Sequence, residues 1–552
     1  MAAPSEGKAS RALVPVLAVA LSGILLILIP LLATGWISFM IGVPGYGKYT
    51  LSNYTQVLFD PFGYRVFLNT LIFALGSTAM ALIVAAPLAW SVARTDLPFR
   101  NTISFWLGMV LVIPGFLQGM GWALMLSPNI GILNRFLMEL FGIEEAPFNI
   151  YSLGGMTFAQ GLSLVPPAFF MLLPVFVGMD SSLEEAAFLS GAGKLRTFLR
   201  VNLPLAAPAL VAAAIYVFVL AFALFEVPAV LGFPDRIFVF STMLYFFVHI
   251  QQGTLPEYGL AAAYGSIVMI VSLLMATYYV KLIKQSRRFV TITGKGRRGR
   301  MVSLGKWRSP AFSVVAVYFI LALVLPMLVL FYYSLLPFFK LPSLDAVSSF
   351  TFKNYVNVYT RQGALPLINT GILIAFVPVI VILVGTPISW LVVRSRLRGR
   401  FVIDNIAFLP LAVPRIVLSV SLLYLALVSR DFLPLYGTIF LIAIAHIIAF
   451  MSFATRTLNA AIIQIHTDLE DAGRVSGATV VRVLKRITAP LLKPALFAAW
   501  FWIMLLSFRE VTMAVMLSSA ESIVFPAQIW ILLYARGILI HSICSLRRRC
   551  SL

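Results

Sequence analysis

The chain has 552 residues, of which 61% are hydrophobic and only 11% charged, and its formal net charge is +21. A soluble domain carries about a quarter charged residues, so this composition excludes an ordinary soluble enzyme. The apolar residues form long uncharged runs, such as 12–42 and 66–92. Uncharged runs longer than about 18 residues are typical of transmembrane helices. The sequence therefore predicts an all-α integral membrane protein.

Six membrane spans are expected before the middle of the chain. They cover approximately residues 12–40, 67–93, 103–127, 152–178, 207–232 and 258–280. Lys8 and Arg11 precede the first run, which is longer than the apolar core of a cleaved signal peptide. We therefore expect an uncleaved first helix and a cytoplasmic N-terminus.

The distribution of charge agrees with this orientation. The segment 281–309 holds ten Lys or Arg and no acidic residue, whereas the segment 128–150, on the outer side by alternation, is net acidic. Cationic loops are retained on the cytoplasmic side of a membrane. We therefore expect a cytoplasmic linker at 281–309 between a first half, 1–280, and a second half, 310–552. The basic charge is explained by this topology, so no nucleic-acid partner is expected.

The second half repeats chemically distinct residues of the first. Asn69-Thr70, Pro87, Trp90, Arg94 and Pro114 recur, at a constant offset of 300, as Asn369-Thr370, Pro387, Trp390, Arg394 and Pro414. Internal repeats of this kind define an architecture. With an even number of spans per repeat, both halves enter the membrane in the same direction, which gives two parallel six-helix repeats. Only fifteen residues follow Gly537, so the last helix of the second repeat is expected to be missing or altered.

Each half carries the same spaced motif in the loop between its fourth and fifth spans. The first copy consists of Glu185, Ala186, Ala187, Gly191 and Pro204, and the second of Asp471, Ala472, Gly473, Gly477 and Pro490. The distance from the acid to the proline is 19 residues in both copies. Glycine permits backbone conformations that suit a break between helices. Proline lacks a backbone donor and marks a restart.

This spacing resembles the EAA loop of ABC importer permeases, with the pattern E-A-A-x3-G-x9-I-x-L-P. The first copy departs from it at Val201, and the second at Asp471, Gly473 and Ala489. The resemblance implies the type I permease fold, in a fused two-half form similar to ferric-iron permeases of the bacterial inner membrane. It also implies that the loops are coupling helices, with Glu185 and Asp471 making charged contacts to a separate ATPase.

The partners implied by this resemblance are two copies of an ABC ATPase subunit, a periplasmic substrate-binding protein and membrane lipid. An ordinary loop connecting two spans is the alternative interpretation of each motif. In such importers the binding protein sets specificity. The permease therefore need not contain a site shaped to the substrate.

No catalytic residue, cofactor or metal site is predicted. The segment 190–194 resembles part of a phosphate-binding loop, but Phe188 and Leu195 occupy the positions that require Gly and Ser or Thr. ATP hydrolysis is therefore expected on the separate subunit, and the chain itself is not expected to be an enzyme.

Charged side chains within spans are costly and often functional. Glu226 in the fifth span and Arg509-Glu510 in the eleventh occupy matching places, so all three residues are candidates for the translocation path. The alternative role for the two carboxylates is hydrogen bonding between helices, with Arg509 neutralising a neighbour.

The resemblance of the fused form to ferric-iron permeases makes ferric iron the favoured substrate, and carboxylates are compatible with such a hard cation. Carboxylates suit organic cations as well, and thiamine, polyamines and phosphonates remain alternatives within the same class. A secondary transporter of the major facilitator type is the rival from another class. It also has six plus six spans and a basic central linker, but it predicts no EAA loop.

Overall fold

The computed structural model describes residues 6–180, 182–249, 256–286, 301–395 and 397–535. Among these residues the strands are a short antiparallel pair, β1 (Met40–Ile41) and β2 (Lys48–Tyr49), and the other regular elements are helices. In the part of the chain that the structure describes, seven helices are long and apolar enough to cross a membrane, and four bent helix pairs raise the number of possible spans to eleven. The predicted all-α integral membrane fold is confirmed.

The helices of the first repeat are α1 (Glu6–Ile37), α2 (Ser52–Phe59), α3 (Pro61–Arg94), α4 (Arg100–Val112), α5 (Gly115–Leu126), α6 (Ile132–Phe141), α7 (Leu153–Val177), α8 (Ser182–Leu189), α9 (Lys194–Thr197), the π-helix η1 (Phe198–Asn202), α10 (Leu203–Leu205), α11 (Ala207–Ala223), α12 (Glu226–Gly232), α13 (Phe240–His249) and α14 (Tyr258–Ser286). Of the predicted spans, 12–40, 67–93, 152–178 and 258–280 correspond to α1, α3, α7 and α14.

The helices after the linker are η2 (Gly305–Trp307), α15 (Arg308–Phe319), the π-helix η3 (Ile320–Val324), α16 (Leu325–Ser334), α17 (Leu344–Ser348), α18 (Lys353–Gln362), α19 (Leu365–Arg394), α20 (Arg400–Ala412), α21 (Arg415–Val428), α22 (Ile439–Gln464), α23 (Thr467–Val475), α24 (Val480–Val483), the π-helix η4 (Leu484–Thr488), α25 (Ala489–Leu491), α26 (Lys493–Phe508), α27 (Thr512–Leu517) and α28 (Phe525–Ala535).

The third predicted span, 103–127, is two helices rather than one. The axes of α4 and α5 differ by 87°, and those of α20 and α21, in the second repeat, by 102°. Pro114 and Pro414 occupy the N-cap of the second helix in each pair, and the residue before each proline is extended. Proline disfavours helical geometry in its predecessor and cannot donate into the preceding turn, which explains both breaks.

The sequence repeat is also a repeat of contacts. The hydroxyl oxygen of Thr70 accepts a hydrogen bond from the backbone N–H of Phe240 at 2.8 Å, and Thr370 accepts one from Phe525 at the same distance. Phe240 and Phe525 begin α13 and α28, so the same side chain caps the same helix in both repeats.

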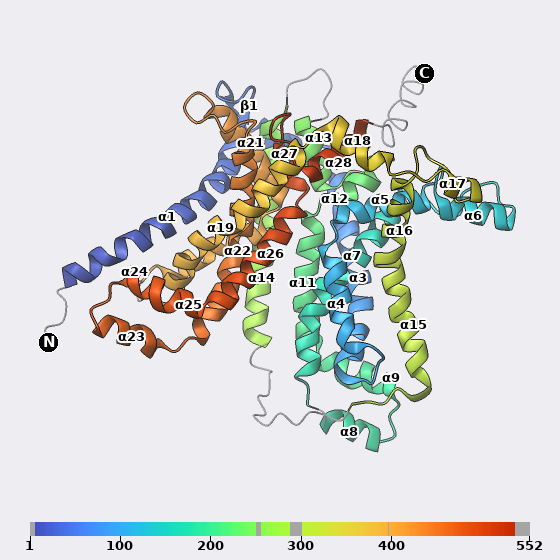
Figure 1. Cartoon of the computed structure of the whole chain (residues 1–552), viewed down its shortest axis with the longest axis horizontal. Helices are drawn as coiled ribbons and strands as arrows, with labels where there is room; N and C mark the ends of the chain where they lie inside the picture. Colours follow the sequence, from blue (N-terminus) through green and yellow to red (C-terminus); the bar gives the residue numbers. More distant parts are fainter. Residues whose placement is uncertain (1–5, 181, 250–255, 287–300, 396, 536–552) are drawn as a thin grey trace. The chain divides into compact units, whose positions relative to one another are not determined.

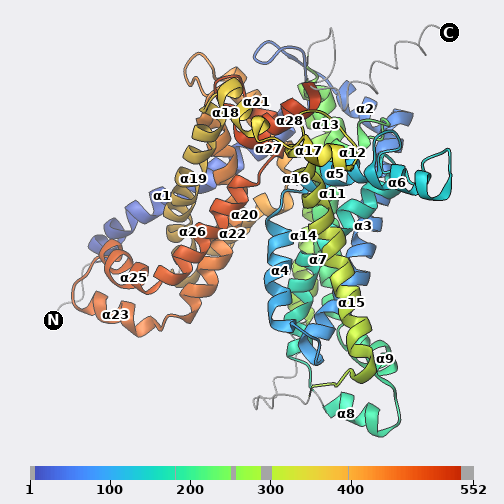
Figure 2. The same ribbon diagram turned by 45° about the vertical axis from the view of Figure 1, so that its right-hand side comes forward.

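The helices form two compact units that differ from the two sequence halves. One unit, which we call the α1–α19 unit, joins Met1–Phe59, Leu244–Ile270 and Gly363–Ala535, whereas the other, the α3–α7 unit, is built mainly from Asp60–Met243 and Val271–Gln362. In the α1–α19 unit, α1 packs against α19 and α21 (Figure 1). In the α3–α7 unit, α16 packs against α5, and η3 against α7 (Figure 2). The leading helices of each repeat therefore join the core of the other repeat.

The loop that carries each motif lies at one end of its unit. In the α3–α7 unit, α8 and α9 lie at one end of the long helices, and α5 and α12 lie toward the other (Figure 2). In the α1–α19 unit, α23 to α25 lie at the end where α1 begins (Figure 1). Residues 287–300 of the linker and the predicted altered helix after residue 537 lie outside the described residues.

Candidate functional site

Both motif copies fold into the same series of short elements. In the first, α8 is followed by a turn at Gly191, then α9, η1 and α10, and the chain bends by 73° into α11. In the second, α23 is followed by a turn at Gly477, then α24, η4 and α25, and the chain bends by 78° into α26. Pro204 and Pro490 lie in the first turns of α10 and α25, as expected for residues that restart a helix.

The two motif glycines end the first helix of each copy in a left-handed conformation. The φ angles of Gly191 and Gly477 are 77° and 81°. The N–H of Ala192 donates to the carbonyl of Ala187 at 2.9 Å, and that of Ala478 to the carbonyl of Gly473 at 3.0 Å. These bonds satisfy carbonyls at the helix end. The predicted role of glycine as a break between short helices is confirmed.

A buried carboxylate anchors the first copy, and it is Glu184 rather than the motif acid Glu185. Glu184 is 3% exposed and forms an ion pair of 2.6 Å with Arg94, the last residue of α3. The amide of Asn202, in η1, donates to the same carboxylate at 2.5 Å. Arg94 also donates to the carbonyl of Met179 at 3.1 Å. The short helix α8 is therefore fixed at its first turn to both neighbouring segments.

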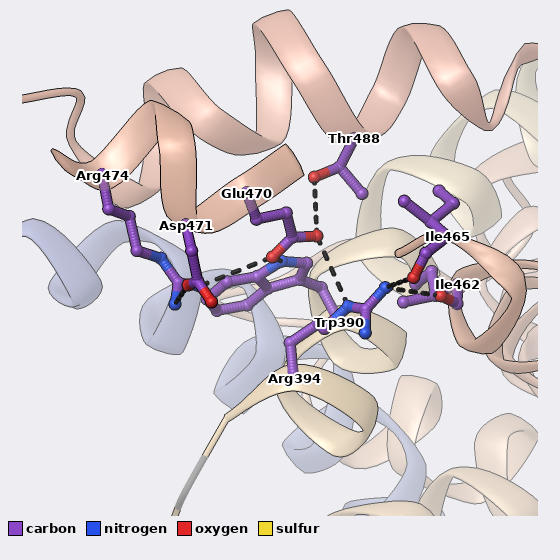
Figure 3. Close-up of polar contacts among 8 residues, drawn as sticks. All are labelled: Trp390, Arg394, Ile462, Ile465, Glu470, Asp471, Arg474 and Thr488. Carbon is purple, nitrogen blue, oxygen red and sulfur yellow. Dashed lines mark hydrogen bonds and ion pairs between the residues drawn. The ribbon is translucent and has the colours of Figure 1, made fainter. Parts of the chain in front are cut away.

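The second copy has the same anchor (Figure 3). Glu470 is 1% exposed, and its carboxylate accepts hydrogen bonds from Trp390 at 3.3 Å and from Thr488 at 3.0 Å. Arg394, the last residue of α19, lies 3.5 Å from it and also donates to the carbonyls of Ile462 and Ile465. Because each buried charge has a partner and several hydrogen bonds, the cost of its desolvation is offset.

The first two motif residues of each copy face outward beside these anchors. Glu185, Ala186, Asp471 and Ala472 are exposed, and Asp471 pairs with Arg474 on its own helix at 3.1 Å. Each copy thus presents an acid and a small side chain on the outer surface of a short helix. This surface suits close approach by another protein.

One departure of the second copy from the motif has a packing cause. A Cβ atom at Gly473 would lie 2.5 Å from Cδ1 of Ile487, a distance too short for two carbon atoms. The first copy has Ala187 and Val201 at these positions, so a larger residue on the helix is matched by a smaller one on the π-helix. The two departures therefore compensate for each other.

The two carboxylates proposed for the path are buried at the starts of short helices. Glu226 is 5% exposed and accepts a hydrogen bond from the backbone N–H of Phe116 at 3.0 Å. Glu510 is 1% exposed, accepts one from Met513 at 3.1 Å and forms an ion pair with Arg415. Each carboxylate thus joins a broken third span to the end of the fifth span of its own repeat.

Sequence reasoning missed three of these residues. Glu184 and Glu470 share the offset of 286 found in the loops, which could have indicated their common role. Arg415 follows Pro414 directly and has Gly115 as its counterpart, so the repeat gave no signal for it. Arg509, the predicted neutralising cation, is the C-cap residue of α26.

Comparison with known proteins identifies a protein family whose domain includes the second motif loop. Residues 385–540 match the family described as binding-protein-dependent transport system inner membrane component, a region that includes α23, Glu470 and Gly477. Residues 385–540 carry the domain of this family. The resemblance to inner membrane components of such transport systems is thereby confirmed, and the chain is a multi-pass membrane protein.

Full-length relatives extend the similarity beyond this domain. The chain is 28% identical over 425 residues to the ferric transport system permease protein FbpB of Actinobacillus pleuropneumoniae, covering 76% of this chain and 59% of the relative. It is 22% identical over 486 residues to the Fe(3+)-transport system permease protein FbpB 2 of Haemophilus influenzae, covering 87% and 86%. It is 29% identical over 238 residues to the spermidine/putrescine transport system permease protein PotB of Escherichia coli, covering 42% and 82%. The chain spans 59% and 64% of the length of the first two relatives that it matches.

Proposed function

We propose that this chain is the membrane-spanning subunit of an ATP-driven importer, which receives its substrate from a periplasmic binding protein. The proposal rests on the observation that the two loops that carry the motif copies have the same geometry. In both, a buried Arg–Glu pair fixes a short helix that presents an exposed acid, Glu185 or Asp471, at one end of its unit. A rigid, exposed helix is what a partner needs in order to transmit a conformational change into the spans.

The proposed partners are two ATPase subunits, one for each loop. The motif residues of both loops would contact them, from Glu185 to Pro204 in the first copy and from Asp471 to Pro490 in the second. Hydrolysis then takes place on these subunits, on the cytoplasmic side, where the N-terminus and the basic linker are expected.

Ferric iron is the proposed substrate. The relatives that cover most of the chain are named as ferric transport permeases. Glu226 and Glu510 are proposed to lie along the path, as carboxylates that favour a cationic substrate. Spermidine or putrescine is a second candidate, because PotB has higher identity over the shorter stretch that it matches.

The test is reconstitution in vesicles of the full chain with the proposed ATPase and binding protein. We expect uptake of ferric iron that requires ATP and the binding protein and is unaffected by excess spermidine. Uptake of labelled spermidine in the same vesicles would show that the substrate is a polyamine rather than iron. Uptake by the chain alone, driven by an ion gradient, would contradict the importer function and favour a secondary transporter.

The double variant with Glu185→Gln and Asp471→Asn tests the docking surface in the same system. These exposed side chains contribute little to folding, so the variant should insert normally. We expect reduced recovery of the ATPase with the purified chain. Full recovery, with normal transport, would show that the acids of the motif do not take part in docking.

A further inference from the structure

The end of the linker is joined by hydrogen bonds to the segment that follows α3. We call Val302–Leu304 the linker end. The N–H of Val302 donates to the carbonyl of Arg94 at 2.8 Å, and the N–H of Asp96 donates to the carbonyl of Val302 at 3.3 Å. Thr95 and Val302 form an isolated parallel β-bridge. The backbone of the linker end is therefore hydrogen-bonded to the end of α3 as one strand residue is to another.

The side chain of Asp96 completes this attachment. Its carboxylate accepts the backbone N–H of Leu304 at 2.7 Å and the hydroxyl of Ser303 at 3.4 Å. The N–H of Leu304 is the main cause that holds the pKa of Asp96 below its ordinary value. The carboxylate is therefore ionised at neutral pH, and its hydrogen bonds weaken only as the pH falls through that lowered pKa.

The linker end is packed as well as hydrogen-bonded. Val302 and Leu304 are 8% and 6% exposed, whereas Ser303 between them is exposed. This alternation is that of a strand with one face buried. The attachment is therefore a built part of the α3–α7 unit.

Arg94 connects this attachment to the first coupling loop. Its carbonyl accepts the bond from Val302, and its guanidinium holds Glu184 at the start of α8. Arg94 is 7% exposed, so it cannot move without disturbing one set of contacts or the other. The repeat offset of 300 gives Arg396 as the counterpart of Asp96, so the carboxylate belongs to the first half alone.

We propose that Asp96 is a positioning residue that holds the linker end against Arg94 and thereby sets the position of α8 for the ATPase. The inference rests on the proposed function for its last step, the engagement of the ATPase. Loss of the carboxylate would free the linker end first and loosen α8 through Arg94. The chain connection between the halves would then control how tightly hydrolysis is coupled to transport at the first loop.

The attachment is tested directly by hydrogen exchange of the purified chain. Asp96→Asn should speed exchange of the Leu304 and Val302 amides by about two- to fivefold, the effect of one partly exposed charged contact. Asp431→Asn is the matched control, since Asp431 is exposed and pairs only with Arg430 among the contacts described. Unchanged exchange in the Asp96 variant would overturn the attachment.

The positioning role is tested by the amount of substrate transported per ATP hydrolysed, measured in the reconstituted system. We expect this ratio to fall in Asp96→Asn and to stay normal in Asp431→Asn. Faster exchange with an unchanged ratio would overturn the positioning role and leave Asp96 a structural residue. Failure of the wild-type chain to bind the ATPase would overturn the proposed function and the coupling step, whereas the exchange result would stand.

A reversible disulfide cross-link can restore the contact between positions 96 and 303 after the carboxylate is removed. In a chain with Cys544→Ser and Cys550→Ser, Asp96→Cys and Ser303→Cys replace two side chains that contact each other. Under reducing conditions the ratio should resemble that of Asp96→Asn, and oxidation to a disulfide should restore it. No recovery in a chain shown to be cross-linked would contradict the proposal.

Discussion

Two adjacent acids in each loop have opposite surroundings, although they are one residue apart. Glu184 and Glu470 are buried against an arginine, whereas Glu185 and Asp471 are exposed. Removing one partner of a buried pair leaves an uncompensated charge, and an exposed carboxylate has no comparable effect on folding. The two positions can therefore be separated by experiment.

Glu184→Gln should destabilise the chain by about 3 kcal/mol, because Arg94 remains buried opposite a neutral side chain. Glu185→Gln, the matched control, should leave stability unchanged and reduce only recovery of the ATPase. Thermal unfolding in detergent, followed by the fraction of chain that stays monodisperse, measures the first effect, and co-purification measures the second. Equal stability of the two variants would contradict the anchoring role of Glu184.

Glu226 and Glu510, the carboxylates proposed for the path, are expected to respond differently to neutralisation. Glu510→Gln leaves Arg415 without its ion pair and should lower the free energy of unfolding by about 1–3 kcal/mol. This loss is smaller than for a fully buried pair, because solvent reaches the guanidinium of Arg415. In Glu226→Gln the amide oxygen can still accept the N–H of Phe116, so stability should change by less than about 1 kcal/mol. Slower iron uptake by Glu226→Gln at normal stability would support its place on the path. Normal uptake would leave Glu226 as an interhelical hydrogen-bond acceptor.

At the level of elements, the loop that carries each motif is a short helix held against a π-helix. The contact between Gly473 and Ile487 leaves no room for a methyl group, whereas the first copy uses the reverse combination of Ala187 and Val201. Overpacking of this kind is relieved by the far end of a side chain or by a shift of the helix. The position of α23 therefore depends on this pair.

Gly473→Ala gains about 1 kcal/mol of helix propensity but overpacks Cδ1 of Ile487, so the two effects oppose each other. Ile487→Val removes that methyl group and should cost less stability in the presence of Gly473→Ala than it does alone. The double variant has the residue pair of the first copy. Ile487→Val alone is the control, since it removes the crowding methyl group without adding atoms. Hydrogen exchange of α23 amides measures the effect, and additive losses in the double variant would contradict direct packing between the two residues.

At the level of the whole molecule, hydropathy predicted where the spans lie and the repeat predicted which residues correspond. Hydropathy did not predict the breaks after Ile113 and Val413. A run of apolar residues shows how long a span is, but not whether the axis of its helix bends. The sequence also did not predict the ion pair between Arg94 and Glu184, because the two residues are distant in sequence and each is typical of a charged residue in a loop. The spacing of the glycines and prolines was informative because it acts on the local backbone. The exchange of leading helices between the repeats is a tertiary arrangement that no local pattern encodes.

The orientation of the chain is the last prediction, and it follows from the charge of its loops. The exposed Ser303, in the basic linker, should be cytoplasmic, and the exposed Glu145, in the acidic segment after α6, should be periplasmic. In a chain with Cys544→Ser and Cys550→Ser, a membrane-impermeant thiol reagent added to intact cells should label Glu145→Cys and not Ser303→Cys. Inverted vesicles should give the opposite result. Labelling of Ser303→Cys from outside would place both coupling loops on the wrong side for an intracellular ATPase, and the importer function would then be untenable.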